Sequence, residues 1–181
     1  GILFASLRSM NSGITRFLID GYVEIIRNTP FLVQLFIIYF GLPAVGFRVG
    51  AEVAALIGMT INLTAYSTEI IRSGIEAVHK SQIEAGEALG FTRLQIYRHV
   101  IIFLALAKVY PALCSQFVLM MLASSVCSVI STQELAASAA FVESQTYRSF
   151  EVYIVVTLIY LLLALCLRAV LALVGLWLFG R

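Results

Sequence analysis

The chain has 181 residues, of which 61% are hydrophobic and 12% are charged, with a formal net charge of +2 and a mean hydropathy of +0.97. An ordinary soluble domain is about a quarter charged, and a fold of this size cannot remove so much apolar surface from water. The composition therefore excludes a soluble globular protein and indicates an integral membrane protein. Because the apolar runs are rich in Leu, Ala and Ile and lack period-two alternation, we expect an all-α polytopic helix bundle and not a β-barrel.

Four segments are long and apolar enough to be predicted as membrane-crossing helices, which need about 20 mostly apolar residues. They are residues 17–42, 50–71, 100–130 and 152–179. The sequence begins within a helical pattern, so we expect residues 1–7 to be the end of a further helix whose beginning is missing. The prediction is therefore about five transmembrane helices.

Prolines and one lysine predict where two of these spans bend, begin or end. Pro30 predicts a kink, or a short segment leading into the true span, within the first of them, and Pro43 predicts its end. In the third segment, Lys108 and Pro111 predict that residues 100–107 lie at the membrane interface and that the span proper starts near Val109.

The basic residues are divided unequally between the two sides of this predicted topology. Arg48 and Arg148 fall on one side, and nine fall on the other. The nine are Arg8, Arg16, Arg27, Arg72, Lys80, Arg93, Arg98, Lys108 and Arg181. Because cytoplasmic loops carry the excess of Lys and Arg, the central polar loop is predicted to lie in the cytoplasm.

That central loop, residues 80–94, contains a short acidic segment of small residues. Most of its residues favour a helix, and Gly90 is expected to end that helix in the left-handed conformation. The members of the segment are Glu84, Ala85, Gly86, Glu87, Ala88 and Gly90. Small side chains allow a protein partner to approach closely, so we interpret the segment as a docking helix. The alternative is an ordinary solvated loop helix.

Polar side chains on the second span form the candidate transport site. Gly58, Asn62, Tyr66 and Glu69 recur at helical spacing and therefore share one face. Polar and acidic groups inside a membrane usually face the bundle interior or a water-filled cavity. Gln116 adds a polar group on the third span. Two alternatives stay open, a local ion pair between Glu69 and Arg72 and a helix–helix hydrogen bond for Asn62.

The sequence has no group of residues with the spacing of a catalytic site or a metal site. Cys114, Cys127 and Cys166 sit in apolar runs without metal-ligand spacing and are interpreted as small apolar filler. His79 and His99 form no cluster, and the sequence has no glycine-rich phosphate-binding loop. We therefore expect no catalytic, cofactor or metal residues, and no hydrolysis of ATP by this chain.

The central loop carries a resemblance to a known family. Glu84-Ala85-Gly86, then Gly90, then Val100-Ile101-Ile102-Phe103 resemble the coupling-loop signature of permease subunits of binding-protein-dependent ABC importers. That signature has Glu-Ala-Ala, a glycine four residues later and Ile-x-Leu-Pro at a fixed distance. Other runs resemble the polar amino-acid uptake subfamily: Tyr22-Val23-Glu24, Arg27-Asn28-Thr29-Pro30-Phe31-Leu32-Val33-Gln34-Leu35, Ile38-Tyr39-Phe40-Gly41-Leu42-Pro43 and Ala65-Tyr66-Ser67-Thr68-Glu69-Ile70-Ile71-Arg72-Ser73-Gly74-Ile75.

The sequence departs from this family at identifiable positions. Gly86 replaces an alanine, and Phe103 replaces the proline that is expected to bend the chain after the coupling helix. Val100 and Ile102 are size-conservative replacements. The family's Lys-Asp-Thr-Ser-Leu run appears as Leu122-Ala123-Ser124-Ser125-Val126, which lacks the lysine and the acid.

The resemblance implies one transmembrane domain over residues 1–181 in the bacterial inner membrane, acting as the permease subunit of an ATP-driven importer of polar or charged amino acids. It implies that the loop at 80–94 docks on an ABC ATPase dimer, which holds the ATP and Mg²⁺. The other expected partners are a second permease subunit (the same or homologous), an extracytoplasmic solute-binding protein, the amino-acid substrate and membrane lipid, with no nucleic acid. The rival hypotheses are a passive channel subunit and an intramembrane enzyme.

Overall fold

The computed structural model describes residues 1–10 and 13–180, and every regular element in these ranges is a helix. The α-helices are α1 (Ile2–Met10), α2 (Ile14–Arg27), α3 (Phe31–Ala44), α4 (Ala51–Glu76), α5 (Lys80–Ala88), α6 (Arg93–Gln95), α7 (Ile102–Ala123), α8 (Leu135–Thr146) and α9 (Ser149–Phe179). A π-helical segment, η1 (Ile96–Ile101), precedes α7, and a 3-10 segment, η2 (Ser124–Ile130), follows it. The all-α prediction is confirmed.

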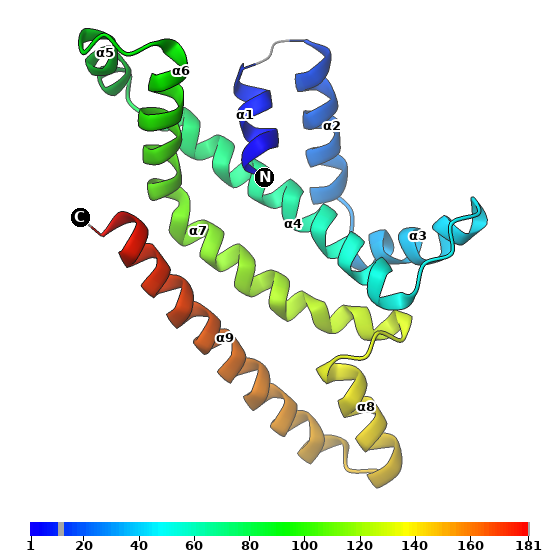
Figure 1. Ribbon diagram of the computed structural model, residues 1–181. Coiled ribbons are helices and arrows are strands. Elements are labelled where there is room, and N and C mark those ends of the chain that lie inside the picture. Colours follow the sequence, from blue (N-terminus) through cyan, green and yellow to red (C-terminus); the bar gives the residue numbers. More distant parts are fainter. Residues whose placement is uncertain (11–12, 181) are drawn as a thin grey trace.

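Three long helices form the body of the molecule, with α7 running between α4 and α9 (Figure 1). Glycines make both crossings close. A Cβ added to Gly74 of α4 would lie 2.7 Å from Val109 Cγ1 and 2.9 Å from the Ala105 carbonyl oxygen of α7. A Cβ added to Gly175 of α9 would lie 2.5 Å from Tyr110 Cε1. Small residues at helix contacts are typical of membrane bundles, because they bring the backbones together.

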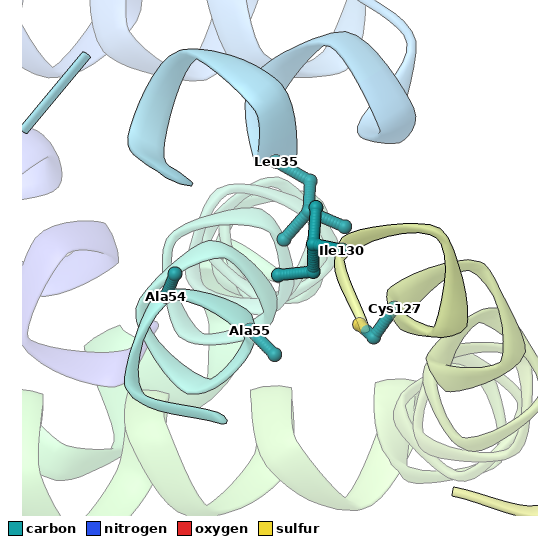
Figure 2. Packing of buried hydrophobic residues seen from close by; sticks show 5 residues of the cluster. All are labelled: Leu35, Ala54, Ala55, Cys127 and Ile130. Atoms are coloured by element: carbon teal, nitrogen blue, oxygen red, sulfur yellow. The ribbon is translucent and has the colours of Figure 1, made fainter. Parts of the chain in front are cut away.

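The two ends of this bundle carry different elements (Figure 1). At one end lie α5, α6 and the C-terminal end of α9, and we call this the α5 end. At the opposite end lie α8 and the α3–α4 connection, and we call this the α8 end. There, a small apolar core joins α3, α4 and η2, and Figure 2 shows its side chains: Leu35, Ala54, Ala55, Cys127 and Ile130. Cys127 thus packs as apolar filler, as the sequence predicts.

The first predicted span is not one kinked helix, because α2 and α3 meet at an angle of 106°. Pro30 has no N–H to donate and disfavours a helical conformation at Thr29. The side chains before it close α2: Asn28 Nδ2 donates to the Glu24 carbonyl at 2.9 Å, and Thr29 Oγ1 donates to the Ile25 carbonyl at 2.7 Å. Residues 17–42 therefore form a bent helical pair. Pro43 lies in the last turn of α3, as expected for a helix end.

The sequence predicts about five membrane spans, but fewer of the described segments have the required length and apolar character. Two continuous helices qualify, Arg93–Ile130 and Ser149–Phe179, and the bent pair of α2 and α3 makes a third if it counts as one span. The predicted second span corresponds to α4, which has 26 residues. This helix carries polar and charged side chains because much of it lies inside the bundle, where it buries Asn62, Ser67 and Thr68.

The third predicted span lies within a helix that runs from Arg93 to Ile130, and the start of the span proper near Val109 stays a prediction. Lys108 serves the packing of two helices: its Nζ donates to the Ala77 carbonyl, at the end of α4, over 3.4 Å. A cation at this position also complements the negative end of the α4 dipole. Pro111 lies within α7 without ending it.

Candidate functional site

The predicted docking helix is α5, and its two ends are both capped. His79 precedes it, and its side chain accepts a hydrogen bond from the Ser81 backbone N–H at 3.3 Å. At the other end Gly90 has φ +76°, which confirms its predicted left-handed conformation. The Gly90 N–H donates to the Glu87 carbonyl at 2.9 Å, and the Phe91 N–H donates to the Gly86 carbonyl at 3.1 Å. This pair of bonds is a Schellman motif, which satisfies the last carbonyls of the helix.

The small residues of α5 face two directions. Five of the six predicted docking residues are exposed at the α5 end: Glu84, Ala85, Glu87, Ala88 and Gly90. Gly86 is buried, and a Cβ added to it would lie 3.1 Å from Ile96 Cγ1. The glycine therefore brings α5 against the helix that follows it. Only the exposed members of the predicted surface are available to a partner.

The helix that follows α5 changes direction where η1 meets α7, and α7 begins at Ile102, one residue before Phe103, which replaces the family's proline (Figure 1). Phe103 sits inside the continuous helix, where its ring packs 5.7 Å from that of Phe179. The chain also turns between Gly90 and Thr92. There Thr92 and Gln95 form a capping box: the Thr92 N–H donates to Gln95 Oε1 at 2.8 Å, and the Gln95 N–H donates to Thr92 Oγ1 at 3.4 Å. This reciprocal capping starts the new helix without a proline.

The polar stripe of α4 divides between a pocket and an ion-pair cluster. Asn62, Tyr66 and Gln116 line one pocket of about 390 Å³, within the range of roughly 300–1,000 Å³ typical of small-molecule sites. The other residues that line it are Thr29, Pro30, Phe31, Leu119, Met120 and Ala123. We call this space the central pocket. Three of the four predicted substrate-path residues therefore lie together, although they come from two helices distant in sequence.

Glu69 lies outside the central pocket and is held by arginines. Arg72 Nη2 donates to Glu69 Oε1 at 2.5 Å, and Arg8 Nη1 donates to Glu69 Oε2 at 2.9 Å. Arg8 also pairs with Asp20 of α2, and Arg27 Nη1 lies 3.8 Å from Glu69 Oε1. The local pair with Arg72 that the sequence left open is therefore present, within a cluster that joins α1, α2 and α4.

All nine residues that line the central pocket are uncharged. Ala123 stands where the family's run carries its acid, so no carboxylate faces the pocket at that position. The Arg27 guanidinium lies over the Tyr66 ring, at 5.5 Å from its centroid. A cation at this distance interacts with the ring face.

Gln34 was not predicted from the sequence as a site residue, although its side chain holds Asn62. Gln34 is buried in α3, and its Oε1 accepts a hydrogen bond from Asn62 Nδ2 at 3.0 Å. The helix–helix hydrogen bond that was the alternative for Asn62 is therefore present, in addition to its position at the pocket. The signal for Gln34 was its place as the one strongly polar side chain of the apolar segment from Phe31 to Leu42, since such residues in membranes have partners or functions.

The acidic residues of the α8 end organise a hairpin of two helices. Glu134 Oε1 accepts from the Ala137 N–H at 2.8 Å and caps α8, while its Oε2 accepts from the Tyr160 hydroxyl at 2.7 Å. Glu143 accepts hydrogen bonds from Ser149 Oγ and the Tyr153 hydroxyl, which together lower the pKa of its carboxyl. These two acids thus have partners within the hairpin, whereas Glu151 is exposed.

Comparison with known proteins places these features in a family. Residues 1–178 match the model of the family described as "Binding-protein-dependent transport system inner membrane component". The chain is 38% identical over 165 residues to the probable glutamine ABC transporter permease protein GlnM of Bacillus subtilis, covering 91% of this chain and 76% of the relative. It is 33% identical over 173 residues to the glutamine transport system permease protein GlnP of Escherichia coli K12, covering 94% and 79%.

A solved structure matches the architecture as well. This structure, described as "Crystal structure of an amino acid ABC transporter with histidines", superimposes with a TM-score of 0.85 at 38% identity. The match covers 96% of this chain and 81% of that one.

Proposed function

Because the chain belongs to the family of binding-protein-dependent transport system inner membrane components, we propose that it is the permease subunit of an ATP-driven importer of polar amino acids. The observation that carries the proposal is the central pocket, where Asn62, Tyr66 and Gln116 offer hydrogen-bonding groups between otherwise apolar helices. Such a site suits the polar groups of an amino acid. The names of the two curated relatives, both glutamine permeases, support the same class of substrate.

Transport is driven from the α5 end. The exposed face of α5 docks on an ABC ATPase dimer, and ATP and Mg²⁺ are held by that partner and not by this chain. Glu84 offers a carboxylate to a basic group or to backbone donors of the ATPase. Closure of the ATPase dimer moves α5 and opens the pocket to the outside, and hydrolysis returns it, in a cycle of alternating access. What supports this role is the exposure of Glu84, Ala85, Glu87 and Ala88 beside a firmly capped helix end.

Two further partners complete the importer in the bacterial inner membrane. A second permease subunit, the same or homologous, closes the pathway, because the few helices of one chain enclose little space. An extracytoplasmic solute-binding protein delivers the amino acid at the α8 end. In this arrangement α5 lies in the cytoplasm, which agrees with the excess of basic residues predicted for that side.

The coupling role is tested with Glu84→Ala in the complex of permease and ATPase reconstituted in proteoliposomes. Since truncating one partner of a charged interface pair typically costs 2–5 kcal/mol, we expect ATP-driven uptake to fall by about tenfold or more, with weaker copurification of the ATPase. Uptake of radiolabelled amino acids is measured with and without ATP. The matched control is Glu151→Ala, which removes an exposed acid at the α8 end and leaves copurification of the ATPase unchanged.

Two outcomes of this experiment contradict the proposal. Intact assembly and uptake in the Glu84→Ala complex would remove α5 from the coupling step. Uptake that proceeds equally in the absence of ATP would favour the rival hypothesis of a passive channel.

A further inference from the structure

Gln34 anchors the bend between α2 and α3 with its side-chain nitrogen. The two hydrogens of Nε2 are shared among three oxygens, the Ile26 carbonyl at 2.7 Å, the Thr29 carbonyl at 3.0 Å and Thr29 Oγ1 at 2.8 Å. Gln34 is 7% exposed, while Thr29 at the bend is exposed. The two carbonyls can only accept hydrogen bonds, and this fixes which end of the Gln34 amide points at the bend.

The orientation of Gln34 determines that of Asn62. Because Nε2 must face the bend, Oε1 faces α4, and Asn62 must present its own nitrogen to that oxygen, over 3.0 Å. The Asn62 carbonyl oxygen is left over, and within the described residues no protein group donates to it. Asn62 lines the central pocket, so this oxygen is the acceptor that the residue has available for a ligand.

Gln34 also connects two walls of the central pocket without lining it. One wall is the bend, which contributes Thr29, Pro30 and Phe31, and the other is α4, which contributes Asn62 and Tyr66. Its hydrogen bonds reach Thr29 on the first wall and Asn62 on the second. A loss of Gln34 therefore frees the Asn62 amide to rotate and allows the two walls to move apart.

We propose that Gln34 is a positioning residue for substrate recognition: it holds the Asn62 amide with its oxygen free to accept a hydrogen bond from a donor group of the bound amino acid. The inference rests on the proposed function, because it assumes that the central pocket binds the substrate. An amide held in one orientation binds only a donor group of the ligand with its oxygen, whereas an amide that can rotate binds either a donor or an acceptor group. Gln34 thus determines that the pocket offers a hydrogen-bond acceptor at this point, and Asn62 makes the contact with the substrate.

The test is a double-mutant cycle on the complex of permease and ATPase purified in detergent, without the solute-binding protein. Binding of radiolabelled glutamine is measured by scintillation proximity, and the other amino acids are tested as competitors. Gln34→Met keeps the length of the side chain and removes every hydrogen bond. We expect it to weaken the Kd by about tenfold in the wild-type background and by less than twofold in the Asn62→Ala background, since residues that act as a unit are not additive.

Control variants separate positioning from structural support. Leu35→Met changes the neighbouring buried residue, which packs in the α3–α4–η2 core, and it lowers thermal stability without changing the Kd. If Gln34→Met does not assemble, Gln34→Glu takes its place in the same cycle. This variant retains an oxygen toward Asn62 but loses the donor to the bend, and we expect it to weaken the Kd as well.

The outcomes distinguish this inference from the function on which it rests. The positioning role is overturned if the Gln34 variant weakens the Kd by the same factor in the Asn62→Ala background as in the wild-type background. An unchanged Kd in a complex with lowered thermal stability overturns it as well. If the wild-type complex binds none of the amino acids, the pocket is not the substrate site, and both the proposed function of the pocket and the role of Gln34 fail.

Discussion

At the scale of single residues, Glu69 shows how the neighbours of a polar group decide its role. Its place on a membrane helix favoured a substrate contact, because intramembrane acids usually serve a function. In the structure it is bound by Arg8 from α1 and by Arg72 from its own helix, so its charge is already compensated. The central pocket is left with neutral hydrogen-bonding groups, and an added positive charge there would lack a carboxylate partner.

The ion-pair cluster predicts a stability effect at Glu69. Glu69→Gln leaves two partly buried arginines with a neutral partner, and the expected cost lies between that of exposed and buried pairs, about 1–2 kcal/mol. In a chain of this length this lowers the Tm by roughly 2–8 °C, which is measured by thermal unfolding of the purified complex.

Glu76→Gln is the matched control for that change. Glu76 also pairs with Arg72, at 2.5 Å, but its side chain is 62% exposed, so its removal leaves the Tm nearly unchanged. Equal Tm shifts in the two variants would show that the cluster around Glu69 does not hold α1 to α4.

At the scale of elements, close crossings and capped ends set the arrangement of the helices. The crossing of α4 and α7 depends on Gly74, and the return of the chain after α5 depends on Gly86 and Gly90. The two glycines Gly86 and Gly90 act differently: Gly90 supplies a backbone conformation, and Gly86 supplies space for Ile96. An alanine at position 86, as in the family, would bring its Cβ to 3.1 Å from Ile96 Cγ1, which is a tight contact.

Gly74→Ala is predicted to separate α4 from α7. The added Cβ meets a backbone carbonyl oxygen at 2.9 Å, which cannot move aside as a side chain does, and overpacking of this kind typically costs 1–3 kcal/mol. We expect a lower Tm and less assembled transporter, measured by thermal unfolding and by size-exclusion chromatography.

The control for this substitution is Gly21→Ala in α2. No heavy atom lies within 4 Å of the position of its added Cβ. The change therefore gains helix propensity, worth about 0.8–1 kcal/mol, and leaves the Tm equal or higher. A Gly74→Ala variant as stable as Gly21→Ala would contradict the close crossing.

At the scale of the whole molecule, α5 and the hairpin of α8 and α9 lie at opposite ends of the long helices (Figure 1). The central pocket lies between these ends, at the α2–α3 bend and against α4 and α7. This separation is what an importer needs, because the energy source and the delivery of substrate act from different sides of the membrane. The number of qualifying apolar spans is low because α4 is shielded by its neighbours and keeps its polar side chains.

Two single-cysteine reporters test this topology after Cys114, Cys127 and Cys166 have been replaced by alanine. Gln82→Cys lies on exposed α5, and Gln145→Cys lies on exposed α8. A membrane-impermeant maleimide is expected to label position 82 only in inside-out vesicles and position 145 only in right-side-out vesicles. Labelling of both positions from the same side would overturn the assignment of α5 to the cytoplasm.

Local physical chemistry allowed several features to be predicted from the sequence by itself. Composition determined the membrane class, helical spacing placed Asn62 and Tyr66 on one face, and Gly90 marked the end of α5. Each of these depends on hydropathy, periodicity or the conformation of one residue, which neighbours in sequence specify. The break at Pro30 was also visible, whereas the angle that it produces was not.

Only the tertiary structure decided which partner each polar group takes. Arg8 reaches Glu69 across 61 positions, Asn62 meets Gln34 across 28, and Gln116 joins Asn62 at the central pocket from a different helix. A carboxylate on a membrane helix can bind a substrate or an arginine, and its sequence position is the same in both cases. The choice depends on which side chains the packed helices bring within hydrogen-bonding distance, and this is why the path residues separated into a neutral pocket and an ion-pair cluster.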